Sequence, residues 1–262
     1  MAEQPPQGVS FSSWRQDLLA AAMLLTRLPV PWPKDQTPNT AQSYWAFPII
    51  GVIVAVLPVV MGTALAASGL PLLAAAAVIL LGIMLITGGL HQDGLADLAD
   101  SLGGRDPAHR LKIMRDSAIG SFGTLALIII TMINIACLAR LGGIDLALMA
   151  QAMVAVAAMS RGMMGLQRWL HQTPDDQGLA VITGQPSQPV MLIGLAMAGL
   201  IGLLFLSIAQ ILALMIIGGL ITLLLGRFMM AWLGGVNGDG LGATQQCTET
   251  MMLMALTIMM AS

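Results

Sequence analysis

Charged and aromatic residues are scarce in this chain of 262 residues. Asp, Glu, Lys and Arg make up 9% of it and Phe, Trp and Tyr 4%, against 57% apolar residues and 29 glycines. A soluble domain needs more charge on its surface, whereas a membrane protein buries apolar helices in lipid. The composition therefore excludes an ordinary soluble enzyme and predicts an all-α, polytopic integral membrane protein.

Cysteines and long basic runs are also lacking. Cys137 lies in an apolar run and Cys247 in a polar turn far along the chain, which predicts two unpaired thiols. The formal net charge is −2, and no basic run is long enough to indicate binding to DNA or RNA. We therefore expect no nucleic-acid partner.

Apolar segments predict a bundle of about seven transmembrane helices, within one membrane domain that covers residues 1–262 and has a flexible N-terminus at residues 1–14. Before these segments, Leu18–Leu25 is too short to cross a bilayer and predicts an interfacial or re-entrant helix. The predicted spans are Pro48–Ala67, Leu72–Leu90, Gly123–Ala139, Ile144–Ser160, Val190–Ser207, Ile208–Gly226 and Met251–Ser262.

The basic residues predict the orientation of this bundle. With seven spans, ten of the 11 basic residues fall on one side and only Arg140 on the other. The positive-inside rule places the richer side in the cytoplasm. The same alternation places an acidic cluster, the loop from Arg161 to Pro189 and the glycine-rich turn Gly234–Thr244 on this side. That loop is interpreted as a solvated connector or as a cover over the substrate.

Acidic residues cluster directly after one apolar run. Asp93, Asp97 and Asp100 are three of the 13 acidic residues, and His91 precedes them. On a helix their carboxylates fall within a wedge of roughly 60°. Such oxygen ligands favour Mg²⁺, or alternatively Mn²⁺, together with a substrate phosphate. We expect the three aspartates to bind metal and act in catalysis, and His91 either to assist catalysis or to make a structural hydrogen bond.

Basic side chains that could bind a diphosphate follow this stripe. Asp106 and Pro107 predict the start of a helix, with the aspartate as its N-cap. The alternative role of the cations is an anchor for lipid head groups. The cations expected to bind substrate are Arg105, Arg110 and Arg115, with Lys112 beside them.

The turn Gly234–Thr244 adds a second group of polar residues. Its glycines let the backbone approach a ligand closely, while Asn237 is expected to bind substrate and Asp239 to bind metal. It lacks the Gly-Lys-Ser/Thr ending of a Walker A loop, and no strand precedes it as a dinucleotide fingerprint requires. By itself it also fits a plain interhelical loop.

These motifs together resemble those of the cobalamin synthase family, also called adenosylcobinamide-GDP ribazoletransferase. The resemblance runs from about residue 20 to 250, with Gln92, Ala118, Asn237 and Gly240 departing from the usual residues. The matching segments read Arg27-Leu28-Pro29-Val30-Pro31, His91-x-Asp93-Gly94-Leu95-Ala96-Asp97-x-x-Asp100, Gly103-Gly104, Ile113-Met114-Arg115-Asp116-Ser117-x-Ile119-Gly120 and Gly238-Asp239-x-Leu241-Gly242-Ala243-Thr244.

The resemblance implies a metal-dependent membrane transferase of vitamin B12 biosynthesis. Its substrates are adenosylcobinamide-GDP and α-ribazole or α-ribazole 5′-phosphate, and its products are adenosylcobalamin or its 5′-phosphate and GMP. The number of subunits stays open, and a homo-oligomer is compatible with the sequence. Positioning and charge neutralisation should dominate such a phosphoryl transfer.

Two other classes of protein are the alternatives. A CDP-alcohol phosphatidyltransferase also arrays aspartates on helices, but Asp93-Gly94-Leu95-Ala96-Asp97 lacks the arginine of its motif. An ion-coupled transporter would carry acidic residues near the bilayer midplane and inverted repeats, whereas the acids here lie at the ends of predicted spans.

Overall fold

The computed structural model describes residues 11–32, 39–174, 181 and 183–261. Within these ranges the regular structure is helical, with no strand, which confirms the all-α prediction. The elements are α1 (Phe11–Leu25), η1 (Thr40–Ala46), α2 (Phe47–Ala67), α3 (Leu72–Thr87), α4 (Leu90–Asp100), η2 (Ser101–Gly103), α5 (Pro107–Met114), α6 (Ser121–Gly142), α7 (Leu146–Leu170), α9 (Gln188–Gly202), α10 (Ile208–Leu233) and α11 (Gly238–Ala261).

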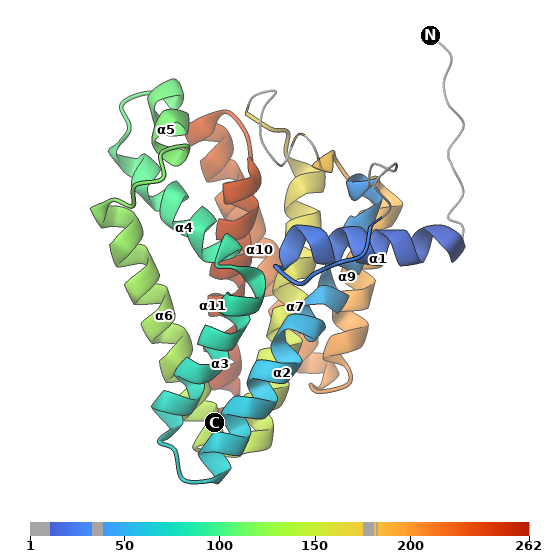
Figure 1. Cartoon of the computed structure of the whole chain (residues 1–262), viewed down its shortest axis with the longest axis vertical. Helices are drawn as coiled ribbons and strands as arrows, with labels where there is room; N and C mark the ends of the chain where they lie inside the picture. The colour runs from blue at the N-terminus through green and yellow to red at the C-terminus, as the bar shows by residue number, and fades with distance from the viewer. Residues whose placement is uncertain (1–10, 33–38, 175–180, 182, 262) are drawn as a thin grey trace.

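Most of the long helices run lengthwise through the molecule (Figure 1). The α2–α3 and α6–α7 connections lie at one end, whereas α4, α5 and the start of α11 lie at the other. Helix α1 lies across the bundle rather than along it, as expected of an interfacial or re-entrant helix. The alternation of the chain thus brings the acidic segment and the glycine-rich turn to the same end of the bundle, as the sequence predicted.

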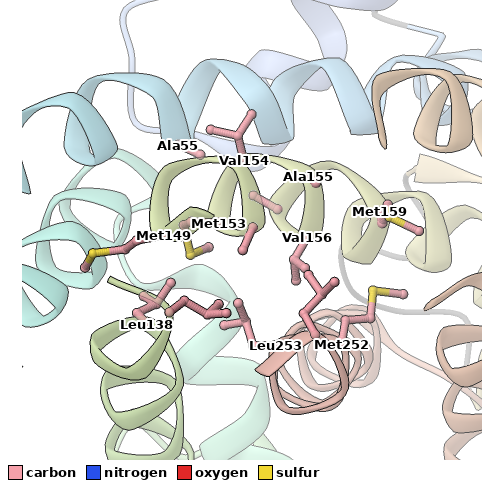
Figure 2. Packing of buried hydrophobic residues seen from close by; sticks show 14 of the residues in the cluster. Ala55, Leu138, Met149, Met153, Val154, Ala155, Val156, Met159, Met252 and Leu253 are labelled. Carbon is pink, nitrogen blue, oxygen red and sulfur yellow. The ribbon is translucent and has the colours of Figure 1, made fainter. Parts of the chain in front are cut away.

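Helix α7 forms the centre of the bundle. About 72% of its most apolar stretch is buried, against 22% for α6 and for α10. Figure 2 shows side chains of α7 such as Met153 and Val156 between α2, which carries Ala55, and α6 and α11, which carry Leu138 and Met252. The outer helices instead expose rows of leucine and isoleucine, which is the pattern of a surface that contacts lipid.

Four helical segments are long and apolar enough to cross a membrane, and the bent pair α3 and α4 raises this number to five. These segments are Thr40–Ala67, Ser121–Gly142, Leu146–Leu170 and Ile208–Leu233. Helix α9 has only 15 residues. The protein is therefore an integral membrane protein, and the count of seven spans stays a prediction.

The prediction that a loop begins at Arg161 and runs to Pro189 is wrong about where the loop begins. Helix α7 continues to Leu170, so Arg161 lies inside it with 1% of its side chain exposed. A charged residue can occupy this buried place because Glu249 of α11 lies 3.9 Å away. The acids Asp175 and Asp176 of the same loop lie outside the described residues.

The N-terminal prediction overlaps α1. Residues 1–10 lie outside the described residues, but the predicted flexible stretch 1–14 includes the first turn of α1, which begins at Phe11. The ring of Trp14 lies 5.6 Å from that of Trp45 and links α1 to η1. The indole N–H of Trp45 donates to Asp17, so α1 is held by an aromatic contact and a hydrogen bond.

Candidate active site

The acidic helix begins at a sharp corner. Gly88 ends α3 with a φ of 68° and Gly89 precedes α4 with a φ of 72°, a left-handed conformation that favours glycine at both positions. The chain bends by 91° between α3 and α4. The side chain of Arg27 packs on Gly88 and leaves no room there for a Cβ atom. The segment that begins at Arg27 therefore supports this corner.

Helix α4 presents the aspartates on one side, as predicted. Asp93 is exposed and Asp97 is half-buried, while Leu95 and Leu98 on other faces are buried in the core. The helix is amphipathic because its acidic stripe and its apolar side are separated at helical spacing. This arrangement leaves carboxylate oxygens accessible at the end of the bundle.

Helices α4 and α11 touch at backbone distance beside these carboxylates. A Cβ atom placed on Gly94 would lie 2.6 Å from the carbonyl oxygen of Asp239 and 2.8 Å from its Cα. One placed on Gly242 would lie 3.2 Å from the Cα of His91. Only glycine permits such an approach at Gly94. The structure therefore joins the acidic stripe and the glycine-rich turn in one site.

The three carboxylates of Asp93, Asp97 and Asp239 interact electrostatically. Asp239 and Asp93 both disfavour a negative charge on Asp97, and Asp93 does the same to Asp239. No ion pair to any of the three forms within the part of the chain that the structure describes. Like charges that lie near one another, with no ion pair among the described residues, make this a candidate place for a cation.

The first turn of α11 holds Asp239 in place. The side-chain amide of Asn237 donates to the Asp239 carboxylate over 3.0 Å, and its carbonyl oxygen accepts from the backbone N–H of Gly240 over 2.9 Å. Burial and the charge of Asp93 raise the pKa of Asp239, which lies outside the candidate spans, to about 6. Asn237 thus orients a metal-ligand candidate.

Asp100 has a different environment from the other aspartates. Its two oxygens accept hydrogen bonds from the backbone N–H groups of Gly120, over 2.6 Å, and Gly123, over 2.8 Å. These amides belong to the start of α6, where a negative charge is favourable. Asp100 therefore ties α4 to α6, and the structure does not free its oxygens for a metal. Its predicted metal and catalytic roles remain untested.

His91 also lies apart from the carboxylates. Its position is roughly 200° around the helix from Asp93, at about 100° per residue. The side chain is 1% exposed, and its Nε2 has no hydrogen-bond partner among the described residues. It lies in the interior, where it interacts electrostatically with Arg161. The structure does not bring it to the side of α4 where a diphosphate would bind.

The predicted cations differ in how far they are exposed. Asp106 accepts from the backbone N–H of His109 and caps α5, as predicted. Arg110 stacks on the ring of Trp232 at 3.3 Å and donates to the Trp232 carbonyl over 2.9 Å, so it fastens α5 to α10. Arg105 and Arg115 have exposed side chains near this helix.

A short segment after α7 lies against the glycine-rich turn. The backbone N–H of Val236 donates to the carbonyl of Gln172 over 2.8 Å, and a Cβ atom on Gly235 would meet the backbone at Pro174. The sequence analysis did not predict this contact. The two adjacent glycines Gly234 and Gly235 could have indicated it, because close approach of two backbones commonly requires glycine.

The chemistry of the donors fits a hard divalent cation. Carboxylate oxygens from two helices, with an amide beside them, are the ligands that Mg²⁺ and Mn²⁺ prefer, and Mg²⁺ commonly keeps waters and substrate phosphate as its other ligands. Among the described residues, no group of three or more His, Cys, Asp or Glu side chains lies close enough together to hold a metal ion. The arrangement therefore suits a cation that is shared with a bound substrate.

Comparisons with known proteins cover nearly the whole chain. A family model described as cobalamin-5-phosphate synthase matches residues 17–257. Curated relatives named adenosylcobinamide-GDP ribazoletransferase include those of Rhizobium etli, 36% identical over 95% of this chain and 98% of the relative, and Rhizobium johnstonii, 35% identical with the same coverage. That of Mesorhizobium japonicum is 33% identical over 94% of both chains. No solved structure matches the chain.

Proposed function

The chain belongs to the cobalamin-5-phosphate synthase family, and we propose that it transfers α-ribazole, or α-ribazole 5′-phosphate, to adenosylcobinamide-GDP and releases GMP. The observation that carries this function is the similarity to the named ribazoletransferases over almost the full length of both chains. The joined acidic site of α4 and α11 supports it, because both of its motifs occur within the matched residues. A CDP-alcohol phosphatidyltransferase or a transporter is not favoured.

The reaction is a phosphoryl transfer between two soluble substrates. The ribose 3′-hydroxyl of the acceptor attacks the phosphorus nearer the corrinoid and forms a new P–O bond. The bond from this phosphorus to the bridging oxygen breaks, so GMP leaves with that oxygen, and the proton of the hydroxyl passes to a carboxylate or to water. The protein must therefore align the two substrates and neutralise charge on the diphosphate.

We propose that Asp93, Asp97 and Asp239 hold Mg²⁺, with Mn²⁺ as a substitute. A divalent cation at this place would offset the charge of the diphosphate and of the leaving guanylate. The carboxylates supply the oxygen ligands, and Asn237 keeps that of Asp239 oriented. Asp97 is half-buried and interacts electrostatically with both other acids, and we propose it as the carboxylate that accepts the proton of the hydroxyl.

The exposed cations around α5 are proposed to bind substrate phosphates. Arg105 and Arg115 lie on the segments that flank this helix, and Lys112 is exposed on the helix itself. Arg110 acts on this surface indirectly, because its guanidinium group is held by Trp232 and by the carbonyl of Gly104. Because its guanidinium group is already bound in this way, Arg110 is proposed to hold α5 and its exposed cations in position. It does not contact the phosphate itself.

We also propose that this site faces the cytoplasm from the bacterial inner membrane. Ten of the 11 basic residues are expected on that side, and α5 carries two of them, Arg110 and Lys112. Helices α4, α5 and the start of α11 share one end of the bundle (Figure 1). Water-soluble substrates could reach the site there without entering the lipid.

The test is a direct assay of the purified protein in detergent. Adenosylcobinamide-GDP, Mg²⁺ and either α-ribazole or its 5′-phosphate are supplied, and GMP and the corrinoid product are measured by chromatography. We expect equal amounts of the two products from the preferred acceptor, and none after chelation of the metal. Absence of GMP with both acceptors would refute the function, whereas activity that survives chelation would refute only the metal.

A further inference from the structure

A buried charged and polar cluster lies in the middle of the bundle, behind the acidic site. Arg161 of α7 and Glu249 of α11 are 1% and 3% exposed, with 3.9 Å between a guanidinium nitrogen and a carboxylate oxygen. Gln245 donates to the Glu249 carboxylate over 2.7 Å and to the hydroxyl of Ser160 over 3.1 Å. Gln246 in turn donates to the Gln245 carbonyl oxygen over 2.7 Å.

This cluster is a poor means of stabilising the fold. Its charge pair is too far apart for a hydrogen bond, and the guanidinium of Arg161 instead donates to the carbonyl of Ala157 in its own helix over 2.9 Å. The Nε of Arg161 has no hydrogen-bond partner among the described residues. Removing two charges from water is costly, and a packed apolar pair of similar volume is often at least as stable. Some other advantage must explain its presence.

The cluster connects the central helix α7 with α4 and α11, the two helices that form the acidic site. Glu249 and Gln245 lie on one face of α11, Arg161 belongs to α7, and Arg161 interacts electrostatically with His91 of α4. Glu249 follows Asp239 by ten residues on the same helix, which is about 15 Å at 1.5 Å per residue. A rotation or slide of α11 at Glu249 would therefore displace Asp239 by a similar amount.

Along the rest of its length, helix α11 packs mainly through side chains that allow small movements. Its neighbours in the core are mainly apolar side chains such as Met153 and Met163, which tolerate small shifts. The contact of Gly94 with the Asp239 backbone tolerates almost none. A directional polar cluster suits this requirement, since buried polar groups can select one register among several apolar packings.

We propose that Arg161 and Glu249 are positioning residues for the phosphoryl transfer, which set the rotation and depth of α11 and so hold Asp239 opposite Asp93 and Asp97. This inference rests on the proposed function. The two residues do not touch the substrate or the metal. They act through the helix, at a distance from the reacting atoms.

The test compares a double variant with a matched control. Arg161→Met/Glu249→Met removes both charges together and keeps the volume of the side chains. We expect it to remain monodisperse in detergent with a near-normal melting temperature, while kcat falls about 10²-fold, as for a shift of about 1 Å, and KM changes less than about threefold. The control is Asn134→Leu in α6, which removes an equally buried polar group and should leave kcat unchanged.

A second readout does not depend on activity. Hydrogen–deuterium exchange should speed up in the double variant over residues 240–246 and 90–97, with little change in α6 and α10. If kcat and this local exchange match those of the wild type, the proposal is overturned. An equal loss of kcat in Asn134→Leu would overturn it too, because that would reveal a general effect of core polarity.

The experiment also covers a double variant that does not fold and a wild type that has no activity. If the double variant does not fold, Glu249→Gln replaces it, since this change keeps the shape and the hydrogen bonds of the side chain. We then expect a lower kcat at normal KM, and a wild-type kcat would overturn the proposal. If the wild type releases no GMP, the proposed function fails, whereas the exchange experiment still decides whether the pair positions α11.

Discussion

The contact between Gly94 and Asp239 allows a sharp test of the joined site. In Gly94→Ala the new methyl carbon would lie 2.6 Å from the Asp239 carbonyl oxygen, 0.8 Å short of the 3.4 Å at which ordinary contact begins. Both neighbours are backbone atoms, so the helices must separate. Overpacking of this kind typically costs about 1–3 kcal/mol. The better helix propensity of alanine returns about 1 kcal/mol of that cost.

The effect on turnover should exceed the effect on stability. A displacement of about 1 Å at catalytic groups commonly lowers the rate about 10²-fold. We therefore expect Gly94→Ala to lose about that factor in kcat while its melting temperature in detergent falls by only a few degrees. The measurement is GMP release at saturating substrate, with thermal unfolding of the same preparations.

Two other glycines provide a graded control. Gly242→Ala would bring its methyl carbon to 3.2 Å from the backbone of His91, a mild overlap, and should lose less than about tenfold. Gly219→Ala on α10 meets no atom within 4 Å and should behave as the wild type. If Gly94→Ala is as active as Gly219→Ala, the two helices do not form one catalytic site.

The remaining predictions concern the metal, the pairing of acids, pH and topology. Asp97→Ala, and equally Asp93→Ala, should abolish GMP release at any Mg²⁺ concentration while membrane insertion is retained. Asp239→Asn should be severely impaired, and its loss should not multiply with that of Asp97→Ala if both act as a unit; independent losses would indicate two sites. Because the pKa of Asp239 is raised to about 6, activity should fall as the pH drops through about 6, and for this group the metal-free fold should lose stability as the pH rises from 3.8 towards 6. A cysteine at Thr173 should resist a membrane-impermeant reagent on intact cells, whereas one at Gly69 should be labelled; the reverse result would contradict the orientation.

The sequence predicted the helix that carries the aspartates because helical spacing is a strong local signal, while the metal and catalytic roles of these residues stay predictions. The steps from Asp93 to Asp97 and Asp100 defined one side of a helix, and Asp106 with Pro107 defined the start of the next. The common end of the two polar segments followed from the alternation of spans. None of these inferences required knowledge of which helices pack together.

Long-range packing decided the features that the sequence did not predict. Arg161 was placed in a loop because the predicted apolar span ended at Ser160, and its partner Glu249 lies 88 positions further along the chain. The stacking of Arg110 on Trp232 of a distant helix was also not predicted, and the expected role of Arg110 in binding phosphate stays a prediction. The close approach at Gly94 leaves no periodic signal, since the partner is a backbone and not a side chain.

The glycine corner at Gly88 and Gly89 also sets the rotation of α4 about its own axis, and so the direction in which its aspartates point. Connections between helices usually tolerate insertions and deletions. Here the chain leaves the corner directly into α4, with the N–H of Asp93 bonded to the carbonyl of Gly89. Adding or removing one residue would turn the whole aspartate stripe by about 100° and advance it by about 1.5 Å. A length change that would be silent in most loops would thus point the carboxylates away from α11.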